Sequence, residues 1–254
     1  MSGLNRQRIS FPNLWLFDFD RTLAILEPVV DWPRSRKELE AELRASEIPA
    51  PLLDELSIAI PQGNLRLYAA LWERLLEGPP SRRPMREADA RAVLERASAI
   101  ITRNELAGVD RAEPTPGAAE ILHALAGRGI AAAIVTSNSS RTVIRWLSLH
   151  GVAQCVREIV GRDSGLRLKP APAMIARAVE LFGAKAGDAL FIGDSVDDFH
   201  AADSSGVRFY AIASDGERRA VLTNAGARDI FASPASIAAH FGIMEIRLNG
   251  KEVM

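Results

Sequence analysis

Cysteine and lysine are scarce in this sequence of 254 residues. The single cysteine, Cys155, excludes an internal disulfide framework and any cysteine-rich metal site. Because its neighbours are mostly apolar, we expect a buried and unreactive thiol. The basic residues are almost all arginines, so a lysine beside other polar groups is informative. The lysines are Lys37, Lys169, Lys185 and Lys251.

Long hydrophobic runs and an excess of one charge are also absent. No run reaches the roughly 20 apolar residues that cross a membrane, and residues 1–12 lack the apolar stretch of a signal peptide. The formal net charge of −1 gives no basic field that would attract nucleic acid or an anionic membrane. We therefore expect a cytoplasmic protein that binds neither nucleic acid nor membrane. No sequence feature specifies an oligomeric state.

Residues 28–110 have a helical pattern without a convincing strand. Breaks rich in proline and glycine divide this stretch into four expected helices, at 34–45, 51–59, 65–76 and 85–106. The composition of the whole chain, 48% hydrophobic and 25% charged, is that of an ordinary globular protein. Its length suits one large domain, or one domain that carries a second, smaller one.

The rest of the chain alternates strands and helices. The apolar run Leu14–Phe17 predicts a buried strand, and the alternation resumes after residue 117. Further strands are expected at 130–135, 156–160, 189–192, 207–212 and 229–231. Helices are expected at 118–127, 140–150, 171–182, 196–206 and 234–240. This alternation predicts a parallel sheet that is covered by helices on both faces.

We therefore predict a doubly wound, Rossmann-like α/β core with an inserted all-helical domain. The core would comprise residues 1–24 and 112–242, and the insert residues 25–111. In the remaining tail, residues 243–254, Asn249-Gly250 would turn a small hairpin, or the end is simply loose.

Two carboxylates follow the first expected strand. After Leu14–Phe17 the chain reads Asp18-Phe-Asp20-Arg-Thr22, at the carboxyl end of a strand, where open α/β sheets bind ligands. Asp18 and Asp20 can face one pocket, where one carboxylate attacks phosphorus and the other handles the proton of the leaving group. Acidic residues also often end strands, so this segment alone leaves the question open.

Two further segments offer groups that bind phosphate. Thr136-Ser137-Asn138 provides a hydroxyl and backbone N–H groups just before an expected helix. Helix capping by Asn138 or Ser139 is the alternative, and both roles are compatible. Lys169 opens another helix and can hold a phosphate as a point charge, or it is a solvated loop residue.

A fourth segment, residues 193–198, is rich in aspartate. Asp194 is placed to bind a hard cation together with Asp18. Asp198 lies one helical turn further on and can orient either a metal-bound water or Lys169. Asp197 faces another way by helical spacing, so we assign it to the surface. The alternative for the whole segment is capping, since aspartates stabilise a helix N-terminus.

The four segments together resemble the haloacid dehalogenase-like hydrolase superfamily, and phosphoglycolate-phosphatase-like members are the most similar. The matching segments are Asp18-Phe-Asp-Arg-Thr22, Thr136-Ser-Asn138, Lys169-Pro170 and Gly193-Asp-Ser-Val-Asp-Asp198. Glu113-Pro-Thr-Pro-Gly117, which leads back into the core, is also typical. The resemblance covers the whole expected core, and the inserted helices resemble the cap domain of that superfamily.

The resemblance implies a phosphatase that acts on a small phosphorylated metabolite. Asp18 would be the nucleophile that forms an aspartyl-phosphate, and Asp20 would protonate the leaving oxygen and then activate water. Mg²⁺ would be held by Asp18, Asp194 and the main-chain carbonyl of Asp20. The charge balance explains the need for a metal, because three carboxylates would otherwise face a phosphate dianion.

The phosphate oxygens would be held by the second and third segments. The resemblance assigns this role to Thr136, the adjacent residues Ser137 and Asn138, and Lys169. One position departs from the family, because Arg21 stands where glycine is usual. We expect this substitution to need a different loop backbone, since glycine tolerates conformations that arginine avoids. The guanidinium would either contact a substrate anion or face solvent.

Asp20 argues against two other activities of the superfamily. Dehalogenases lack this second aspartate, and phosphonatases replace it and need a lysine in the cap, where only Lys37 is present. A phosphomutase would keep all four segments and is the enzymatic alternative. A phosphate-binding regulatory module with little turnover is the alternative from another class.

The insert is expected to choose the substrate. It would rotate on linkers near 23–26 and 112–116, close over the strand ends and favour small metabolites over phosphoproteins or nucleic acid ends. Its loops at 59–64 and 78–85 are the candidate contacts. Three arginines around the second loop either bind a second anionic group or are simply solvated: Arg82, Arg83 and Arg86.

Overall fold

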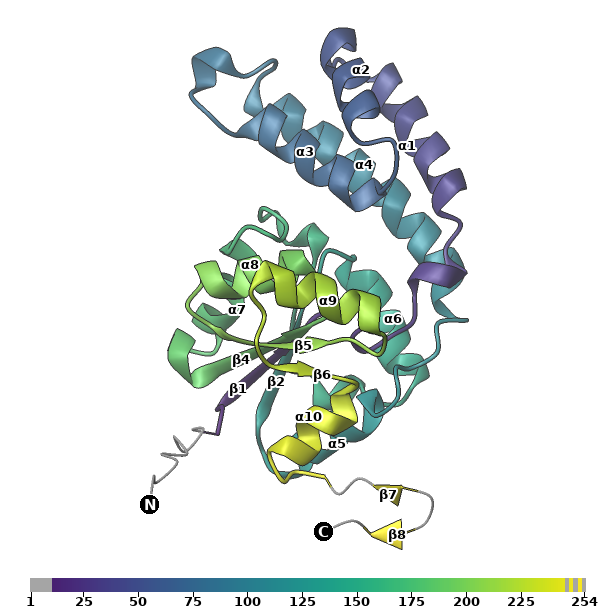
Figure 1. Ribbon diagram of the computed structural model, residues 1–254. Coiled ribbons are helices and arrows are strands. Elements are labelled where there is room, and N and C mark those ends of the chain that lie inside the picture. The colour runs from purple at the N-terminus through teal and green to yellow at the C-terminus, as the bar shows by residue number, and fades with distance from the viewer. Residues whose placement is uncertain (1–10, 245–246, 249–250, 253–254) are drawn as a thin grey trace.

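The computed structural model describes residues 11–244, 247–248 and 251–252. It consists of an α/β core and a lobe of helices that stands above one edge of the core (Figure 1). The lobe is formed by α1–α4, which follow the first strand in sequence and precede the second. The predicted fold class, a doubly wound α/β core with inserted helices, is confirmed.

A parallel sheet of strand order β3-β2-β1-β4-β5-β6 forms the centre of the core. The strands are β1 (Leu14–Phe17), β2 (Ala131–Val135), β3 (Glu158–Val160), β4 (Ala189–Gly193), β5 (Arg208–Ile212) and β6 (Ile230–Phe231). The order reverses at β1, and Phe17 lies opposite both Ile134 on β2 and Ile192 on β4. The segments that follow these three strands therefore emerge together at the point where such sheets bind ligands.

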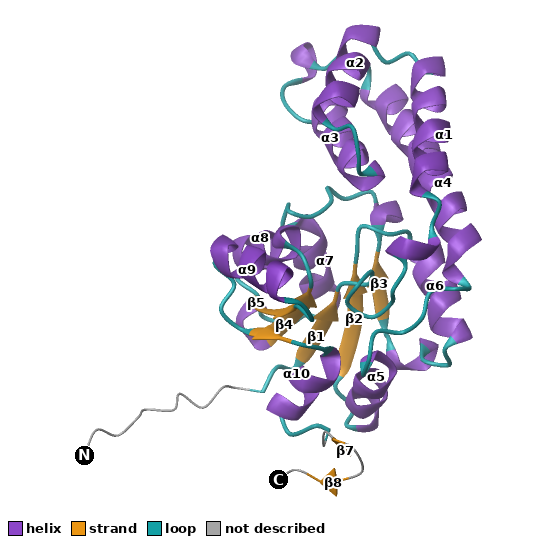
Figure 2. Cartoon of the chain, turned by 45° about the vertical axis from the view of Figure 1, so that its right-hand side comes forward, coloured by secondary structure: helices purple, strands orange, loops and turns teal. Residues whose placement is uncertain are grey.

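Helices cover both faces of the sheet (Figure 2). One face packs against α7 (Ala173–Leu181) and α8 (Val196–Ser204), the other against α5 (Ala118–Gly127), α6 (Ser140–Leu149) and α10 (Pro234–His240). Leu14 and Leu16 face the first layer, and Trp15 and Phe17 face the second. Because both faces of β1 are buried, its sequence is apolar throughout instead of alternating.

The insert contains the four expected helices. They are α1 (Trp32–Ala45), α2 (Ala50–Ala59), α3 (Asn64–Leu76) and α4 (Glu87–Val109). The first begins two residues earlier than predicted, because the side chain of Asp31 caps it by accepting from the backbone N–H of Arg34. The last begins two residues later and ends three residues later than predicted, and most of its buried residues lie in its second half.

The two linkers of the insert run side by side. The backbone N–H of Ile25 donates to the carbonyl of Glu113 at 2.8 Å, and that of Thr115 donates to the carbonyl of Leu23 at 2.9 Å. The polypeptide therefore leaves the core and returns to it at one place. The division of the chain at residues 24 and 112 remains a prediction.

One helix of the core is absent from the predicted set. α9 (Gly216–Ala225) begins after Asp215, whose side chain accepts from the backbone N–H of Arg218, and ends at Gly226. Leu222 is its one buried residue. Because only one of its residues is buried, the segment has no repeat of apolar positions at helical spacing, and the sequence pattern therefore did not indicate a helix.

The end of the chain supports the hairpin alternative. β7 (Arg247–Leu248) and β8 (Lys251–Glu252) pair in antiparallel fashion, while Asn249 and Gly250 themselves lie outside the described residues. Residues 1–10 of the predicted core also lie outside them. Among the helices that the structure describes, none combines the length and apolar character needed to cross a membrane.

The turn after β1 holds Arg21 in an unusual conformation. Its φ is 61°, in the left-handed region that favours glycine. Arg21 therefore adopts a conformation that glycine tolerates more readily, while the expectation of a different loop backbone from that of the family remains a prediction. Its guanidinium forms an ion pair with Glu27 near the entrance to the insert.

We predict that Arg21→Gly will not destabilise the protein. A left-handed residue with a side chain costs about 1–2 kcal/mol, which offsets the roughly 0.5–1 kcal/mol that glycine costs through chain entropy. The free energy of unfolding in urea should stay unchanged or rise by about 1 kcal/mol. Arg128→Gly, at a φ of −98°, is the matched control and should lower stability. An equal loss of unfolding free energy in both variants would show that the backbone at Arg21 is not strained.

Candidate active site

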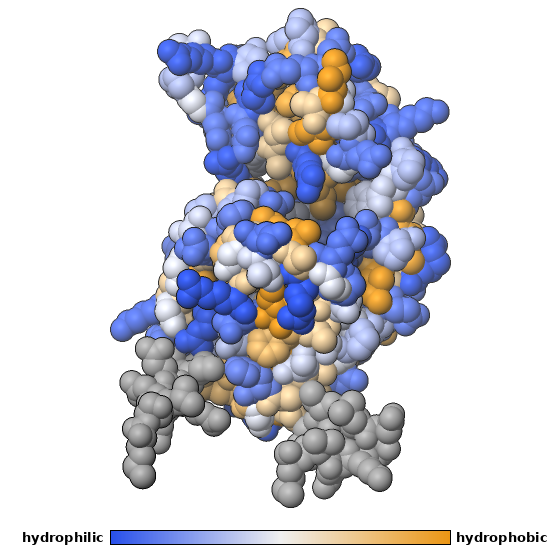
Figure 3. Space-filling model, viewed as in Figure 1, coloured by the Kyte–Doolittle hydropathy of each residue, from blue (hydrophilic) through white to orange (hydrophobic). Residues whose placement is uncertain are grey.

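A cavity of about 1270 Å³ lies between the carboxyl edge of the sheet and helices α1 and α3 of the insert. The space-filling view shows the surface hollowed between the insert and the core (Figure 3). All the residues that the sequence singled out for catalysis, phosphate and metal binding line this cavity: Asp18, Asp20, Thr136, Ser137, Asn138, Lys169 and Asp194. The fold therefore brings together segments that are up to 176 positions apart along the chain, from Asp18 to Asp194.

Lys169 lies between two buried carboxylates. Its Nζ donates to Oδ1 of Asp18 at 2.6 Å, to Oδ1 of Asp198 at 2.5 Å and to the carbonyl of Val135 at 3.2 Å. Burial acts to lower the pKa of Lys169, but the two carboxylates together raise it above its usual value. The ammonium is therefore charged, and all three of its donors are used.

Burial raises the pKa of Asp18 to about 7, although the ammonium of Lys169 acts in the opposite direction. The Asp18 carboxylate accepts from Lys169 through Oδ1, and a backbone hydrogen bond from Phe19 also acts to lower its pKa. A buried carboxylate that is oriented by a cation and lines the cavity can attack an electrophile there.

Asp198 is held by the start of α8 as well as by Lys169. Its Oδ2 accepts from the backbone N–H groups of Asp194 and Ser195, at 3.2 and 3.1 Å, and from the hydroxyl of Ser195 at 2.7 Å. A Cβ at Gly193 would lie 2.6 Å from the carboxyl carbon of Asp198, so only glycine permits this packing. Of the two roles proposed for Asp198, orientation of Lys169 is the one that the contacts support.

Asp194 has a partner that the sequence did not reveal. The guanidinium of Arg218, from α9, forms an ion pair with its carboxylate. Burial, followed by the charges of Asp198, Asp18 and Asp20, raises the pKa of Asp194 well above its usual value. Arg218 thus faces Asp194, while Lys169 faces Asp18 and Asp198.

The carboxylates fit a divalent cation. Carboxylate oxygens of Asp18, Asp194 and Asp198 lie within 4.8 Å of one another, and an all-oxygen donor set suits Mg²⁺. Both oxygens of Asp198 already accept hydrogen bonds, which favours Asp18 and Asp194 as the ligands, and this assignment remains a prediction. The part assigned to the main-chain carbonyl of Asp20 remains a prediction.

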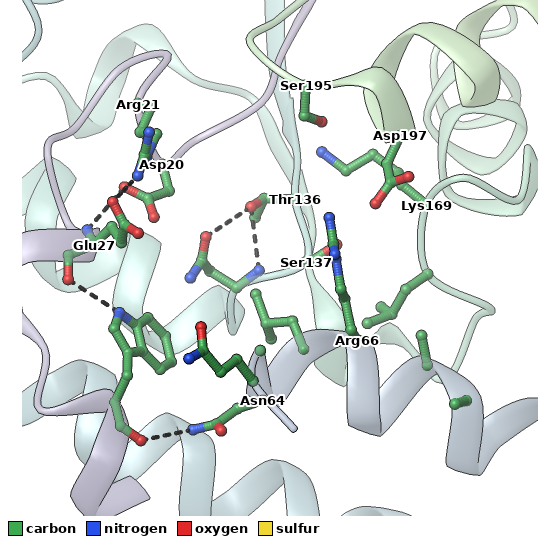
Figure 4. A pocket seen from close by; sticks show the side chains of 18 of the residues that line it. Asp20, Arg21, Glu27, Asn64, Arg66, Thr136, Ser137, Lys169, Ser195 and Asp197 are labelled. Carbon is green, nitrogen blue, oxygen red and sulfur yellow. Dashed lines mark hydrogen bonds and ion pairs between the residues drawn. The ribbon is translucent and has the colours of Figure 1, made fainter. Parts of the chain in front are cut away.

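Asp20 is tied to the beginning of the insert. Its Oδ1 accepts from the backbone N–H groups of Leu26 at 2.9 Å and Glu27 at 3.1 Å, and the close view shows its carboxylate beside Arg21 (Figure 4). Burial raises its pKa to about 6, against the hydrogen bond from Leu26. A carboxyl group with a pKa near neutrality can both give and take a proton.

In the segment after β2, some polar groups bond to other parts of the protein and others face the cavity. The Thr136 hydroxyl donates to Oδ1 of Asn138 at 3.1 Å, and Nδ2 of Asn138 donates to Glu105 at 3.0 Å. The cap of α6 is Ser139, whose side chain accepts from the backbone N–H of Thr142. Within residues 11–244, the backbone N–H and hydroxyl of Ser137 donate to no protein group, so Ser137 is the member best placed to bind an anion.

The insert contributes residues that differ from those expected. The loop at 59–64 lines the cavity in part, but the loop at 78–85 does not. Arg83 and Arg86 pair with the acidic residues Glu87 and Asp89, so of the two alternatives for these arginines the contacts support surface charges and not a second anion site. Asp197, which we assigned to the surface, lines the cavity instead.

Arg66 of α3 is the cation of the insert that the sequence missed. It lines the cavity near Ser137 and Asp197 (Figure 4), and among the described residues it has no hydrogen bond or ion pair. Arg36, by contrast, donates to Glu40 and to the carbonyl of Ile60. Lys37 also lines the cavity, but the presence of Asp20 still argues against phosphonatase chemistry.

Known proteins share both the sequence pattern and the fold. A family model described as haloacid dehalogenase-like hydrolase matches residues 74–212. A phosphoglycolate phosphatase from Rhodospirillum rubrum is 32% identical over 127 residues, which cover 50% of this chain and 52% of the relative. The pyrophosphatase PpaX of Halalkalibacterium halodurans is 28% identical over 131 residues, 52% of this chain and 61% of the relative.

The chain thus spans about half the length of the first of these curated relatives. Among solved structures, a hydrolase from Pseudomonas syringae superposes with a TM-score of 0.60 at 22% identity. The superposition covers 89% of this chain and 96% of that one. At this identity the likeness concerns the fold.

We predict that Mg²⁺ binding will weaken as the pH falls. Protons compete for Asp18 and Asp194, whose pKa values are raised, so affinity should drop with falling pH by about tenfold per pH unit for each proton that the metal displaces. Isothermal titration calorimetry at pH 6 and 8, in buffers of different ionisation enthalpy, measures both affinity and released protons. Asp203→Asn on the exposed side of α8 is the control. An affinity that is equal at both pH values would contradict the carboxylate site.

Proposed function

This chain belongs to the haloacid dehalogenase-like hydrolase family, and we propose that it is a Mg²⁺-dependent phosphatase that acts on small phosphate monoesters. The observation that supports this proposal is the buried contact of Asp18 with Lys169, at 2.6 Å, beside a large cavity. It provides a carboxylate nucleophile, a fixed positive charge and room for a substrate in one place. Phosphoryl transfer depends chiefly on such positioning and charge stabilisation.

The proposed reaction proceeds in two steps on Asp18. In the first, an oxygen of Asp18 forms a bond to phosphorus while the bond to the ester oxygen breaks, and Asp20 gives its proton to that oxygen. In the second, Asp20 takes a proton from water, which attacks the phosphoaspartate and releases phosphate. Asp20 returns to its protonated form, so the cycle is balanced.

The charges of the site support both steps. Lys169 offsets the charge of Asp18 and Asp198, and the N–H and hydroxyl of Ser137, which donate to no protein group among the described residues, are available to phosphate oxygens. Asp18 and Asp194 would hold Mg²⁺, which would supply neutralisation of the carboxylate and phosphate charges. Thr136 supports the site through Asn138, by orienting the segment that contains Ser137.

We propose that residues 25–111 act as a cap that selects a substrate with a second anionic group. The guanidinium of Arg66, which has no hydrogen bond or ion pair among the described residues, lines the cavity from the insert near Ser137 and Asp197. Relatives that match half of the chain are named phosphoglycolate phosphatase and pyrophosphatase, and both of those substrates carry a second negative group next to the phosphoryl group. Phosphoglycolate is therefore the first substrate to test.

The central test is metal-dependent release of phosphate. Purified protein should hydrolyse phosphoglycolate in the presence of Mg²⁺ and stop in EDTA, and Asp18→Asn should lower kcat by about 10³-fold or more without unfolding the protein. Asp203→Asn should retain wild-type rates. Full activity of Asp18→Asn would remove it as the nucleophile. Isomerisation of a sugar phosphate without phosphate release would instead indicate a phosphomutase, and binding without turnover a regulatory module.

A second test addresses Arg66. Arg66→Ala should raise KM for phosphoglycolate and pyrophosphate by about 10–100-fold, since a charged hydrogen bond contributes about 1.5–3 kcal/mol. The KM for p-nitrophenyl phosphate, which lacks a second anionic group, should change little. Arg82→Ala, an exposed arginine outside the cavity, is the matched control. An equal change in KM for all three substrates would show that Arg66 does not bind a second anionic group.

A further inference from the structure

A buried ion pair joins the insert to the core behind the cavity. Glu105 lies near the end of α4, and Arg162 lies in the short 3₁₀ turn Arg162–Ser164 after β3. Their closest atoms are 2.9 Å apart, and both side chains are 0% exposed. Neither residue lines the active-site cavity, so the reaction proposed above makes no direct use of them.

Both members of the pair hold the phosphate-binding segment. Nη1 of Arg162 donates to the carbonyl of Ser137 at 2.8 Å. Glu105 accepts from Nδ2 of Asn138 at 3.0 Å and from the backbone N–H of Ser139 at 3.2 Å. Three consecutive residues between β2 and α6 are therefore fixed by this one pair.

The other side of the network is α4. Nε of Arg162 donates to the hydroxyl of Ser98 at 3.1 Å, and its Nη2 donates to the hydroxyl of Thr102 at 2.9 Å. Ser98, Thr102 and Glu105 are spaced by four and three residues, so they lie on one face of the helix. With the bonds to Glu105 and Ser137, all five N–H donors of the guanidinium have an acceptor.

Such a network fixes geometry more than it adds stability. Replacing a buried ion pair by apolar residues of similar size is often neutral for folding, because the loss of hydration offsets the attraction of the charges. A fully satisfied network nevertheless admits a single arrangement of its members. Here those members are the helix that carries the insert and the segment that faces the substrate.

We propose that Glu105 and Arg162 are positioning residues, which set the Ser137–Asn138–Ser139 segment relative to α4 for phosphoryl transfer. The proposal rests on the phosphatase function proposed above. α4 is continuous from Glu87 to Val109, and it packs against α1 and α3, which line the cavity. The phosphate-binding segment and the substrate-facing part of the insert are thus attached to the same helix.

The test replaces the pair by apolar residues. The double variant Glu105→Leu/Arg162→Met should fold, with a urea midpoint close to that of the wild type. Its kcat should fall about 100-fold, as expected for a misplacement of about 1 Å, and the inhibition constant of inorganic phosphate should rise. Hydrogen exchange of the Ser139 amide should accelerate. A merely structural pair would change the urea midpoint and leave kcat per folded molecule intact, which would overturn the proposal.

A second variant covers the case in which the double variant does not fold. Thr102→Val removes one bond to Arg162 from α4 and touches neither the cavity nor the phosphate-binding segment. Its kcat and phosphate affinity should fall several-fold. The control is the exposed pair Asp110–Arg145, which also joins the end of α4 to α6; Arg145→Met should change nothing. Wild-type kcat and phosphate affinity in Thr102→Val would overturn the proposal.

The readouts separate this inference from the proposed function. Binding of inorganic phosphate and exchange of the Ser139 amide do not require turnover. If the wild-type protein binds phosphate but hydrolyses no ester, the phosphatase proposal fails while the positioning role is still measured. If it hydrolyses phosphoglycolate and the variants match it in rate, phosphate affinity and exchange, the positioning role alone fails.

Discussion

The burial of Lys169 between Asp18 and Asp198 is the interaction on which the site depends. A charged group inside the protein is tolerated only when it is paired and hydrogen-bonded. Here two carboxylates and a backbone carbonyl accept the three hydrogen bonds of the Lys169 ammonium. The residues around Asp198 allow it to take part in this contact. Gly193 leaves room for Asp198, and the N-terminus of α8 satisfies its second oxygen. Asp18, the proposed nucleophile, is thus oriented by the same contacts that allow Lys169 to be buried.

Much of this arrangement was predictable from local patterns. In a parallel sheet all carboxyl ends point to one edge, so polar segments after buried strands must meet there. The strand Leu14–Phe17, which the structure reproduces residue for residue, therefore placed Asp18 and Asp20 correctly beside Asp194. Cys155 was predicted to be buried and is. These successes share one cause, since each depends on hydrophobic runs and on the residues next to them.

The contacts that the sequence did not reveal are tertiary. Arg218 lies on a helix with a single buried residue, so no periodicity marked the helix or its contact with Asp194. Arg66 and the pair formed by Glu105 and Arg162 depend on how the insert lies on the core. Charged residues on amphipathic helices are usually solvated, and nothing in their spacing distinguishes a buried glutamate from an exposed one. Sequence patterns identify elements more readily than the pairs that form between elements.

The adjacent linkers have a consequence for folding order. The central strand β1 pairs with strands that lie far along the chain, since Leu14 is opposite Ala131 and Ala189. Closing a loop of that length is slow when the intervening chain is disordered. A folded insert, however, presents its two ends side by side and shortens the effective loop to a few residues. Helices with mostly local contacts form quickly, so the insert should act as an internal template that brings the first strand to its neighbours.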